Sequence, residues 1–179
     1  WMNTTKYNDF NVEADLTNSI IVTGRFYESG MLGTNSLNEG YFIAKLSSSG
    51  IWQWAINAAE IEDESISIGQ DNSIYLTGAI QSNPAYFGDI QVIPTGVMDA
   101  FIAKLSNSGV WQWVVHFEGS HSWGKTIHID DLGYIYLAGG FGVTSTFGDV
   151  SVTSSGGFDM FVAKLDLTDP DGDDVFSIH

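Results

Sequence analysis

The residues best suited to chemistry form an acidic run near the end of the sequence. Five aspartates fall within residues 166–174, and Gly172 would allow a sharp turn among them. Hard cations such as Ca²⁺ prefer closely spaced carboxylate and carbonyl oxygens. The alternation at 169–173 is similar to the start of a calcium loop, although the closing glutamate of such a loop is missing. Two interpretations stay open, a solvated acidic turn and a Ca²⁺ site with the ligands Asp166, Asp169, Asp171, Asp173 and Asp174.

A second candidate site contains Trp123, which has no counterpart elsewhere in the sequence pattern. Gly and Ser surround it in residues 119–124, so we expect a turn that presents an exposed aromatic side chain. His121 lies two residues earlier and would share the site. We predict that Trp123 and His121 bind a ligand. The other paired tryptophans recur in the sequence, and we expect them to pack between structural units: Trp52, Trp54, Trp111 and Trp113.

Composition excludes several classes of function for this chain of 179 residues. It has 22 acidic and 6 basic residues, a formal net charge of −16, and a sequence pI near 4.1. A protein that binds phosphate backbones needs the opposite charge, so we expect no nucleic-acid partner. There is no cysteine and therefore no thiolate metal site. We expect no membrane span, since no apolar run reaches about 18 residues.

An internal repeat is the strongest pattern in the sequence. The segments 42–54 and 101–113 are identical at eleven of thirteen positions, and a third copy of their first half begins at Phe161. The repeated position occupied by Lys45, Lys104 and Lys164 supplies half of all the bases. A lysine that recurs in every unit indicates a structural role, and we expect it to pair with a turn carboxylate. The aspartates that recur between units are expected to hold turns.

Each repeat of about 60 residues predicts four short strands, because β-branched and aromatic runs are separated by Gly, Asn, Asp and Ser. In the second repeat these strands are 66–68, 74–78, 101–105 and 111–113. The two middle strands are apolar on both sides, which is typical of a sheet covered on both faces. We expect Trp52 and Trp54 to share one face of the fourth strand.

Such units predict an all-β fold built of β-propeller blades. We divide residues 1–179, taken as one repeat region, into a strand left from a preceding blade (1–9), blade 1 (10–63), blade 2 (64–123) and blade 3 (124–179), with the acidic turn 166–174 in blade 3. The fourth strand of blade 3 is either the run that ends at Ile178 or a strand near Trp1. Three blades are fewer than a closed propeller usually has, so the chain is either part of a longer array or associates with further copies.

These motifs resemble the SBBP-type β-propeller repeats of bacteria. The resemblance rests on the segments 99–105 and 159–165 and on the repeated Ile-Tyr-Leu-Thr/Ala-Gly segments, and it covers nearly the whole chain. Blade 1 departs from it at Gly40, where the other blades have aspartate. The resemblance implies a secreted or cell-surface propeller with a scaffolding or binding role and no catalytic residues.

The sequence therefore predicts a non-enzymatic scaffold or binding module, with a protein or a glycan as partner. The alternative is a structural subunit that assembles with copies of itself into a ring or filament. An enzyme acting on polysaccharides is the third and least favoured class, because the sequence contains no nucleophile elbow, phosphate-binding loop or zinc-protease motif.

Overall fold

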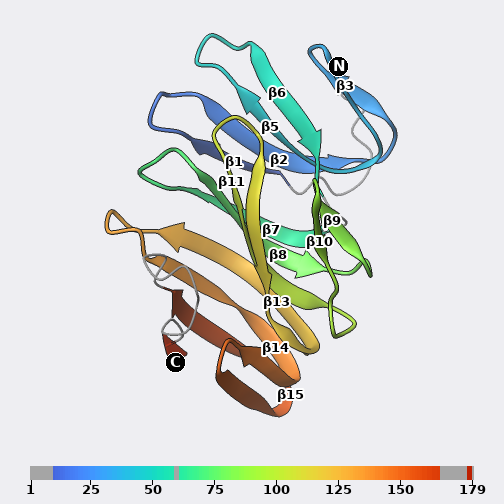
Figure 1. The fold of residues 1–179 in the computed structure, drawn as a ribbon, viewed down its shortest axis with the longest axis vertical. Helices are drawn as coiled ribbons and strands as arrows, with labels where there is room; N and C mark the ends of the chain where they lie inside the picture. The colour runs from blue at the N-terminus through green and yellow to red at the C-terminus, as the bar shows by residue number, and fades with distance from the viewer. Residues whose placement is uncertain (1–9, 59–60, 166–176, 179) are drawn as a thin grey trace.

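Antiparallel β-strands make up the described part of the chain. The computed structural model describes residues 10–58, 61–165 and 177–178. Within these residues there are three four-stranded sheets and two short hairpins, and no helix (Figure 1). The all-β prediction is confirmed.

The first sheet has the strand order β1-β2-β5-β6, which is also the order of these strands along the chain. A short β3–β4 hairpin is inserted between its two middle strands. The paired registers place the repeated lysine of β5 opposite Trp54 of β6. The strands are β1 (Asn11–Ala14), β2 (Ile20–Phe26), β3 (Gly30–Leu32), β4 (Asn35–Leu37), β5 (Gly40–Leu46) and β6 (Trp52–Asn57).

The second sheet repeats this arrangement in the order β7-β8-β11-β12, with the β9–β10 hairpin inserted. Its middle strands are buried on both faces, as the apolar runs predict. Its first strand begins before the boundary expected at residue 64, because the acidic segment there continues the pairing with β8. The strands are β7 (Ile61–Ile68), β8 (Ile74–Ile80), β9 (Ala85–Phe87), β10 (Ile90–Val92), β11 (Asp99–Leu105) and β12 (Trp111–His116).

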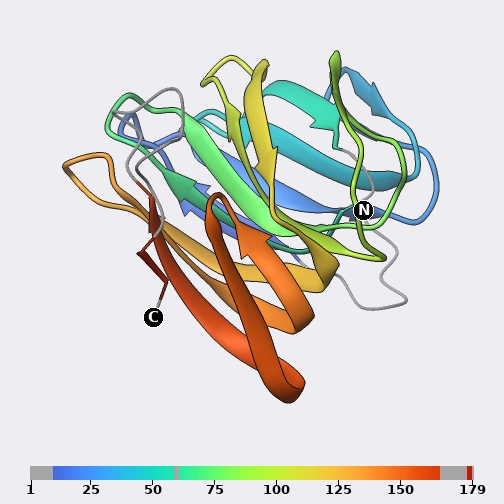
Figure 2. The same ribbon diagram turned by 60° about the horizontal axis from the view of Figure 1, so that its bottom comes forward.

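The third sheet has longer strands, in the order β13-β14-β15-β16. Here β14 and β15 continue directly into one long hairpin, which extends past the rest of the sheet (Figure 2). The last strand pairs Ile178 with Ala163, so of the two alternatives for the fourth strand the segment ending at Ile178 is the one observed. The strands are β13 (Glu118–Ile129), β14 (Ile135–Phe147), β15 (Val150–Leu165) and β16 (Ser177–Ile178).

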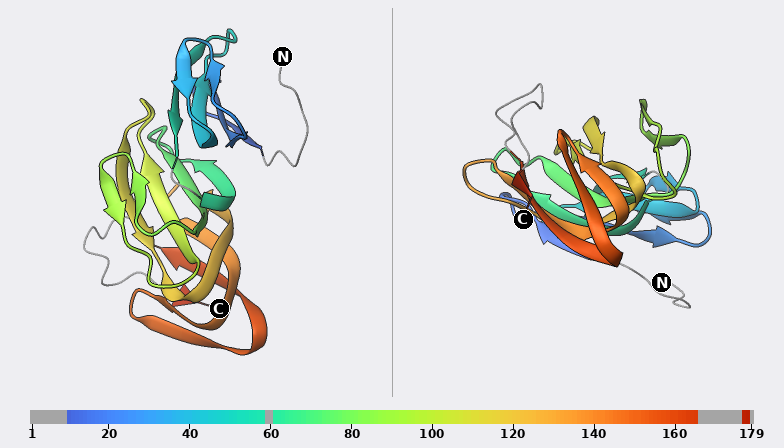
Figure 3. Two further views of the ribbon diagram at one scale, coloured as in Figure 1. Left: turned by 90° about the vertical axis from the view of Figure 1, so that its right-hand side faces the viewer. Right: turned by 90° about the horizontal axis from the view of Figure 1, so that it is seen from below.

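The three sheets stack face to face in chain order (Figures 1 and 3). Ile21 and Ile43 of the first sheet share one hydrophobic cluster with Leu76 and Phe101 of the second. The opposite face of the second sheet joins the third sheet in a separate cluster, in which Ile102 is included. The core therefore consists of two apolar layers between sheets, together with a smaller cluster under the β3–β4 hairpin.

A β-bulge separates the paired tryptophans, so the prediction that Trp52 and Trp54 share a face is wrong. The register between β5 and β6 shifts after Lys45, and the extra residue breaks the alternation of side chains. Trp54 packs toward the second sheet, whereas Trp52 packs in the cluster of its own hairpin. The same shift occurs in β12. The predicted packing between sheets is thus confirmed for Trp54 and Trp113. It is wrong for Trp52, which covers the hairpin of its own sheet, and Trp111 likewise packs on Phe87 of its own hairpin.

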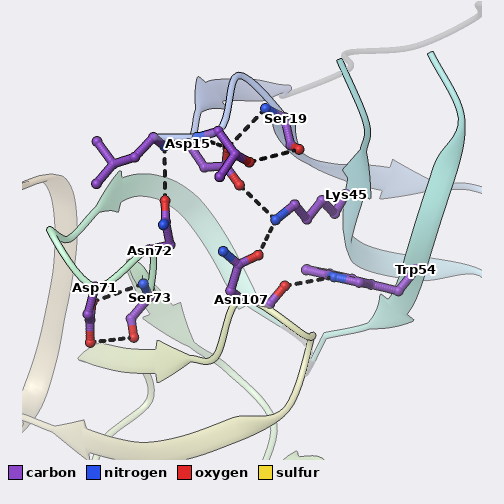
Figure 4. A network of polar contacts seen from close by, with 10 residues as sticks. Asp15, Ser19, Lys45, Trp54, Asp71, Asn72, Ser73 and Asn107 are labelled. Atoms are coloured by element: carbon purple, nitrogen blue, oxygen red, sulfur yellow. Dashed lines mark hydrogen bonds and ion pairs between the residues drawn. The ribbon is translucent and has the colours of Figure 1, made fainter. Parts of the chain in front are cut away.

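A polar network lies at the junction of the first two sheets (Figure 4). The ammonium of Lys45 lies 2.7 Å from a carboxylate oxygen of Asp15, and both side chains are almost fully buried. Lys45 also donates a hydrogen bond to Asn107 in the second sheet, and the indole of Trp54 donates to the Asn107 carbonyl oxygen at 3.0 Å. The network therefore joins the sheets through hydrogen bonds where the apolar layer ends.

The expected pairing of the repeated lysine with a turn carboxylate is confirmed in two sheets. Lys104 lies 3.1 Å from Asp71, but there the carboxylate is more than half exposed. In the third sheet the ammonium of Lys164 lies 3.6 Å from the ring centre of Tyr134. One sequence position thus serves a buried ion pair, a partly exposed ion pair and a cation–π contact.

We expect Lys45→Met to lower the free energy of unfolding by about 3 to 5 kcal/mol, because it leaves the buried carboxylate of Asp15 without its counter-charge. The matched variant Lys104→Met removes the partly exposed pair and is expected to cost about 0 to 1 kcal/mol. Urea unfolding of both variants measures the difference. Equal losses for the two lysines would contradict the role of burial.

The Asp15 carboxylate also predicts a dependence of stability on pH. Burial alone would raise its pKa, but hydrogen bonds from Lys45, Thr17 and Ser19 outweigh burial and lower the pKa from 3.8 to about 2. A pKa that is lower in the folded state stabilises the fold above pH 4, and this contribution is lost as the pH falls toward 2. The difference in the free energy of unfolding between wild type and Asp15→Asn should therefore decrease as the pH falls from 4 to 2, as measured by unfolding at a series of pH values. A difference in the free energy of unfolding that stays constant from pH 4 to pH 2 would contradict this role of Asp15.

Candidate binding face on the third sheet

The candidate site lies on the outer face of the third sheet, defined as the face turned away from the second sheet. Three strands contribute to it in cross-strand rows. One row joins His121, Gly142 and Phe158, and the next joins Trp123, Gly140 and Met160. Residues directly opposite one another across a sheet point to the same side, so both predicted ligand-binding residues lie on this face.

Glycines in the middle strand let the aromatic side chains lie flat on the sheet. A Cβ atom at Gly140 would be 2.3 Å from the Trp123 indole, and one at Gly142 would be 2.7 Å from the Phe158 ring. The corresponding position of the second sheet, Ala79, carries a Cβ. The close approach of Trp123 to the backbone therefore depends on a glycine that is specific to the third sheet.

An aromatic cluster results at the end of the face nearest the β14–β15 hairpin. The Trp123 and Phe158 rings pack edge to face, with their centres 5.2 Å apart, and the His121 ring lies 6.1 Å from Phe158. Trp123 and His121 are half-buried, while Phe158 is exposed. Edge-to-face packing orders such rings, and exposed aromatic surface is a common contact for sugars and proteins.

Trp123 does not lie in a turn, so that part of the prediction is wrong. Residues 119–124 belong to the long strand β13, in which Trp123 pairs with Gly140. Gly and Ser are tolerated in this strand because the adjacent β14 is also rich in glycine and the two backbones approach closely. Trp123 thus comes to lie against the sheet, half-buried and fixed by Phe158.

Phe158 is the site residue that sequence reasoning missed. Phe158, Met160 and Val162 alternate along β15, and Ala163 and Phe161 occupy the opposite side. Apolar residues on both sides of a strand indicate two covered faces. The repeat as a whole has this pattern, and in β15 the pattern also marks the outer face of the third sheet.

At its other end the face becomes polar. Tyr136 of β14 lies between His128 and Lys164 in the cross-strand row. Its hydroxyl donates a hydrogen bond to Asp130 at 3.1 Å. The face therefore runs from an aromatic end, through apolar Met160 and Val162, to a polar end with one lysine.

Asp99 and Asp159 hold turns, as predicted for the recurring aspartates. Asp99 is fully buried and accepts hydrogen bonds from the backbone of Thr95 and Gly96, and His116 lies 3.0 Å from it. The carboxylate of Asp159 accepts a hydrogen bond from the backbone of Ser155. These carboxylates are thus occupied by their own loops.

The predicted calcium ligands Asp166, Asp169, Asp171, Asp173 and Asp174 lie outside the described residues. Within the described ranges, no group of three or more His, Asp or Glu side chains is placed to hold a metal ion. Those ranges also contain no helix with the length and hydropathy needed to cross a bilayer.

Comparison with models of protein families finds no match, and no curated protein is significantly similar in sequence.

The calcium hypothesis for residues 166–174 stays a prediction with a direct test. An ion that binds only the folded state stabilises it, by about 2.7 kcal/mol at one hundred times its Kd. Removing Ca²⁺ with EGTA should therefore lower the melting temperature, and added Ca²⁺ should restore it. The double variant Asp171→Asn/Asp173→Asn should melt alike with and without chelator. An unchanged wild-type melt in excess chelator would favour the solvated turn.

Proposed function

We propose that this chain is a propeller-type repeat module, secreted or displayed at a cell surface, that works without catalysis as a scaffold or binding unit. The proposal is supported by three similar four-stranded sheets stacked through their faces. The resemblance of the repeat to SBBP-type sequences supports the extracellular location. Its acidic composition also suits a surface that must stay dispersed in a salty medium.

The observation that carries the binding role is the outer face of the third sheet. Met160 is 75% exposed and Phe158 is 63% exposed, beside the half-buried Trp123. A contiguous exposed apolar and aromatic face marks an interaction site more often than a chance surface. We infer that a protein or glycan partner binds at its aromatic end, with Trp123 as platform and His121 as a hydrogen-bonding neighbour.

Catalysis is the weaker proposal. A glycosidase needs two free carboxyl groups at a defined separation. Asp15 is committed to Lys45, and the carboxylates of Asp99 and Asp159 accept hydrogen bonds from their own loops. The structural use of these groups favours a binding role over hydrolysis.

The test combines a glycan array and a surface-protein pull-down with point variants. A partner captured by the wild type should lose at least about tenfold in affinity with Trp123→Ala or Phe158→Ala, since an interface anchor of this kind contributes about 2 kcal/mol. Tyr86→Ala, which removes an exposed aromatic side chain from the β9–β10 hairpin, is the matched control and should bind normally. Circular dichroism confirms that the variants are folded. Binding that is insensitive to both substitutions would contradict the site.

A further inference from the structure

The two sheet-to-sheet contacts inside the chain use the same repeated positions. On the first sheet, one residue of β2 and two residues of β5 face the second sheet. On the second sheet, the equivalent residues of β8 and β11 face the third sheet. All six side chains are at most 8% exposed: Ile21, Tyr41, Ile43, Tyr75, Ala100 and Ile102. These positions therefore define a docking face that the chain uses twice.

The third sheet carries the same docking face without a partner among the described residues. The strand registers place Tyr136, Met160 and Val162 at the equivalent positions, opposite Lys164, Gly140 and Ala138 respectively. Their exposed fractions are 36%, 75% and 41%. Met160 and Val162 are thus exposed apolar side chains at positions that are covered in the other two sheets.

The first sheet carries the complementary face. Ile66 and Ile127, in the first strands of the second and third sheets, pack toward the preceding sheet and are 6% and 5% exposed. Val12 is the equivalent residue of the first sheet and is 65% exposed. Ile20 and Val22 are half-buried, whereas their counterparts in the second sheet, Ile74 and Leu76, are buried.

We infer that the outer face of the third sheet binds the first sheet of a second copy of this chain, head to tail. This inference rests on the proposed stacking of repeat units and names the partner for the apolar middle of the face. The structure points to a second copy as the occupant of this face. Within the chain, the docking face is covered twice by the first two strands of the following sheet. The exposed β1–β2 surface is the equivalent surface of the first sheet. Such a heterologous contact closes into a ring or continues as a filament.

The contact between copies would lack an interaction found at the first internal contact. In the first two sheets a tryptophan, Trp54 or Trp113, lies opposite the repeated lysine, but in the third sheet Ser177 lies opposite Lys164. The indole hydrogen bond that Trp54 donates across the first junction has no counterpart there. We therefore expect the contact between copies to be weaker than the first internal contact, so that the copies dissociate on dilution.

The experiment uses sedimentation velocity over a wide range of concentration, with one variant for each face. Met160→Glu places a charge on the third sheet, and Val12→Glu places one on the first. We expect wild type to associate and each variant alone to remain monomeric. An equimolar mixture of the two should form a 1:1 complex, because each retains one intact face. Ile93→Glu, at a position 62% exposed in a loop, should associate like wild type.

Several results would overturn the inference. These are a wild type that stays monomeric at the highest concentration, variants that associate unchanged, or a mixture that forms no complex. Melting curves of each variant verify folding. A monomeric wild type that still binds a partner through Trp123 would refute the inference and leave the proposed function intact. A wild type that associates but binds no partner through Trp123 would support the inference and contradict the proposed function.

Discussion

The structure depends on one constraint, which is that the middle strands of every sheet are apolar on both sides. A sheet of this kind is stable only when a second layer covers each face, because every uncovered side chain forfeits about 1.5 to 3 kcal/mol of burial. The first and second sheets satisfy this requirement through a shared layer, and the second and third do so again. Stacking is thus a consequence of the repeated sequence, and so are the apolar outer faces of the first and third sheets within the described residues.

Polar contacts determine how the layers are aligned. Hydrophobic packing has little directionality, whereas the network of Lys45, Asp15 and Asn107 fixes one position of the first sheet against a turn of the second. The second junction uses other groups, including a hydrogen bond from the backbone of Ile129 to Ser67. The repeat therefore conserves the apolar pattern more strictly than the polar contacts.

The sequence predicted those parts of the fold that follow from local pattern. Strands such as 74–78 and 101–105 could be recognised because apolar, β-branched runs end at turn residues, and each observed strand is two residues longer. The role of Lys45 followed from its repetition. The faces of Trp52 and Trp54 could not be predicted, because a bulge depends on how two strands pair. The same is true of Trp123, since a strand rich in Gly and Ser forms only where its neighbour, here β14, also permits close approach.

The third sheet combines the common pattern with residues of its own. Met160 and Val162 preserve the docking face, while Gly140 allows Trp123 to occupy part of it. A partner bound at Trp123 and a second copy bound at Met160 would compete for adjacent surface, because the two residues flank the same glycine in one cross-strand row. A ligand that binds only the uncovered face would weaken assembly, because it stabilises the unassembled form. The effect would grow with the fraction of faces that the ligand occupies. The proposed binding and the proposed assembly would therefore be coupled through a single cross-strand row.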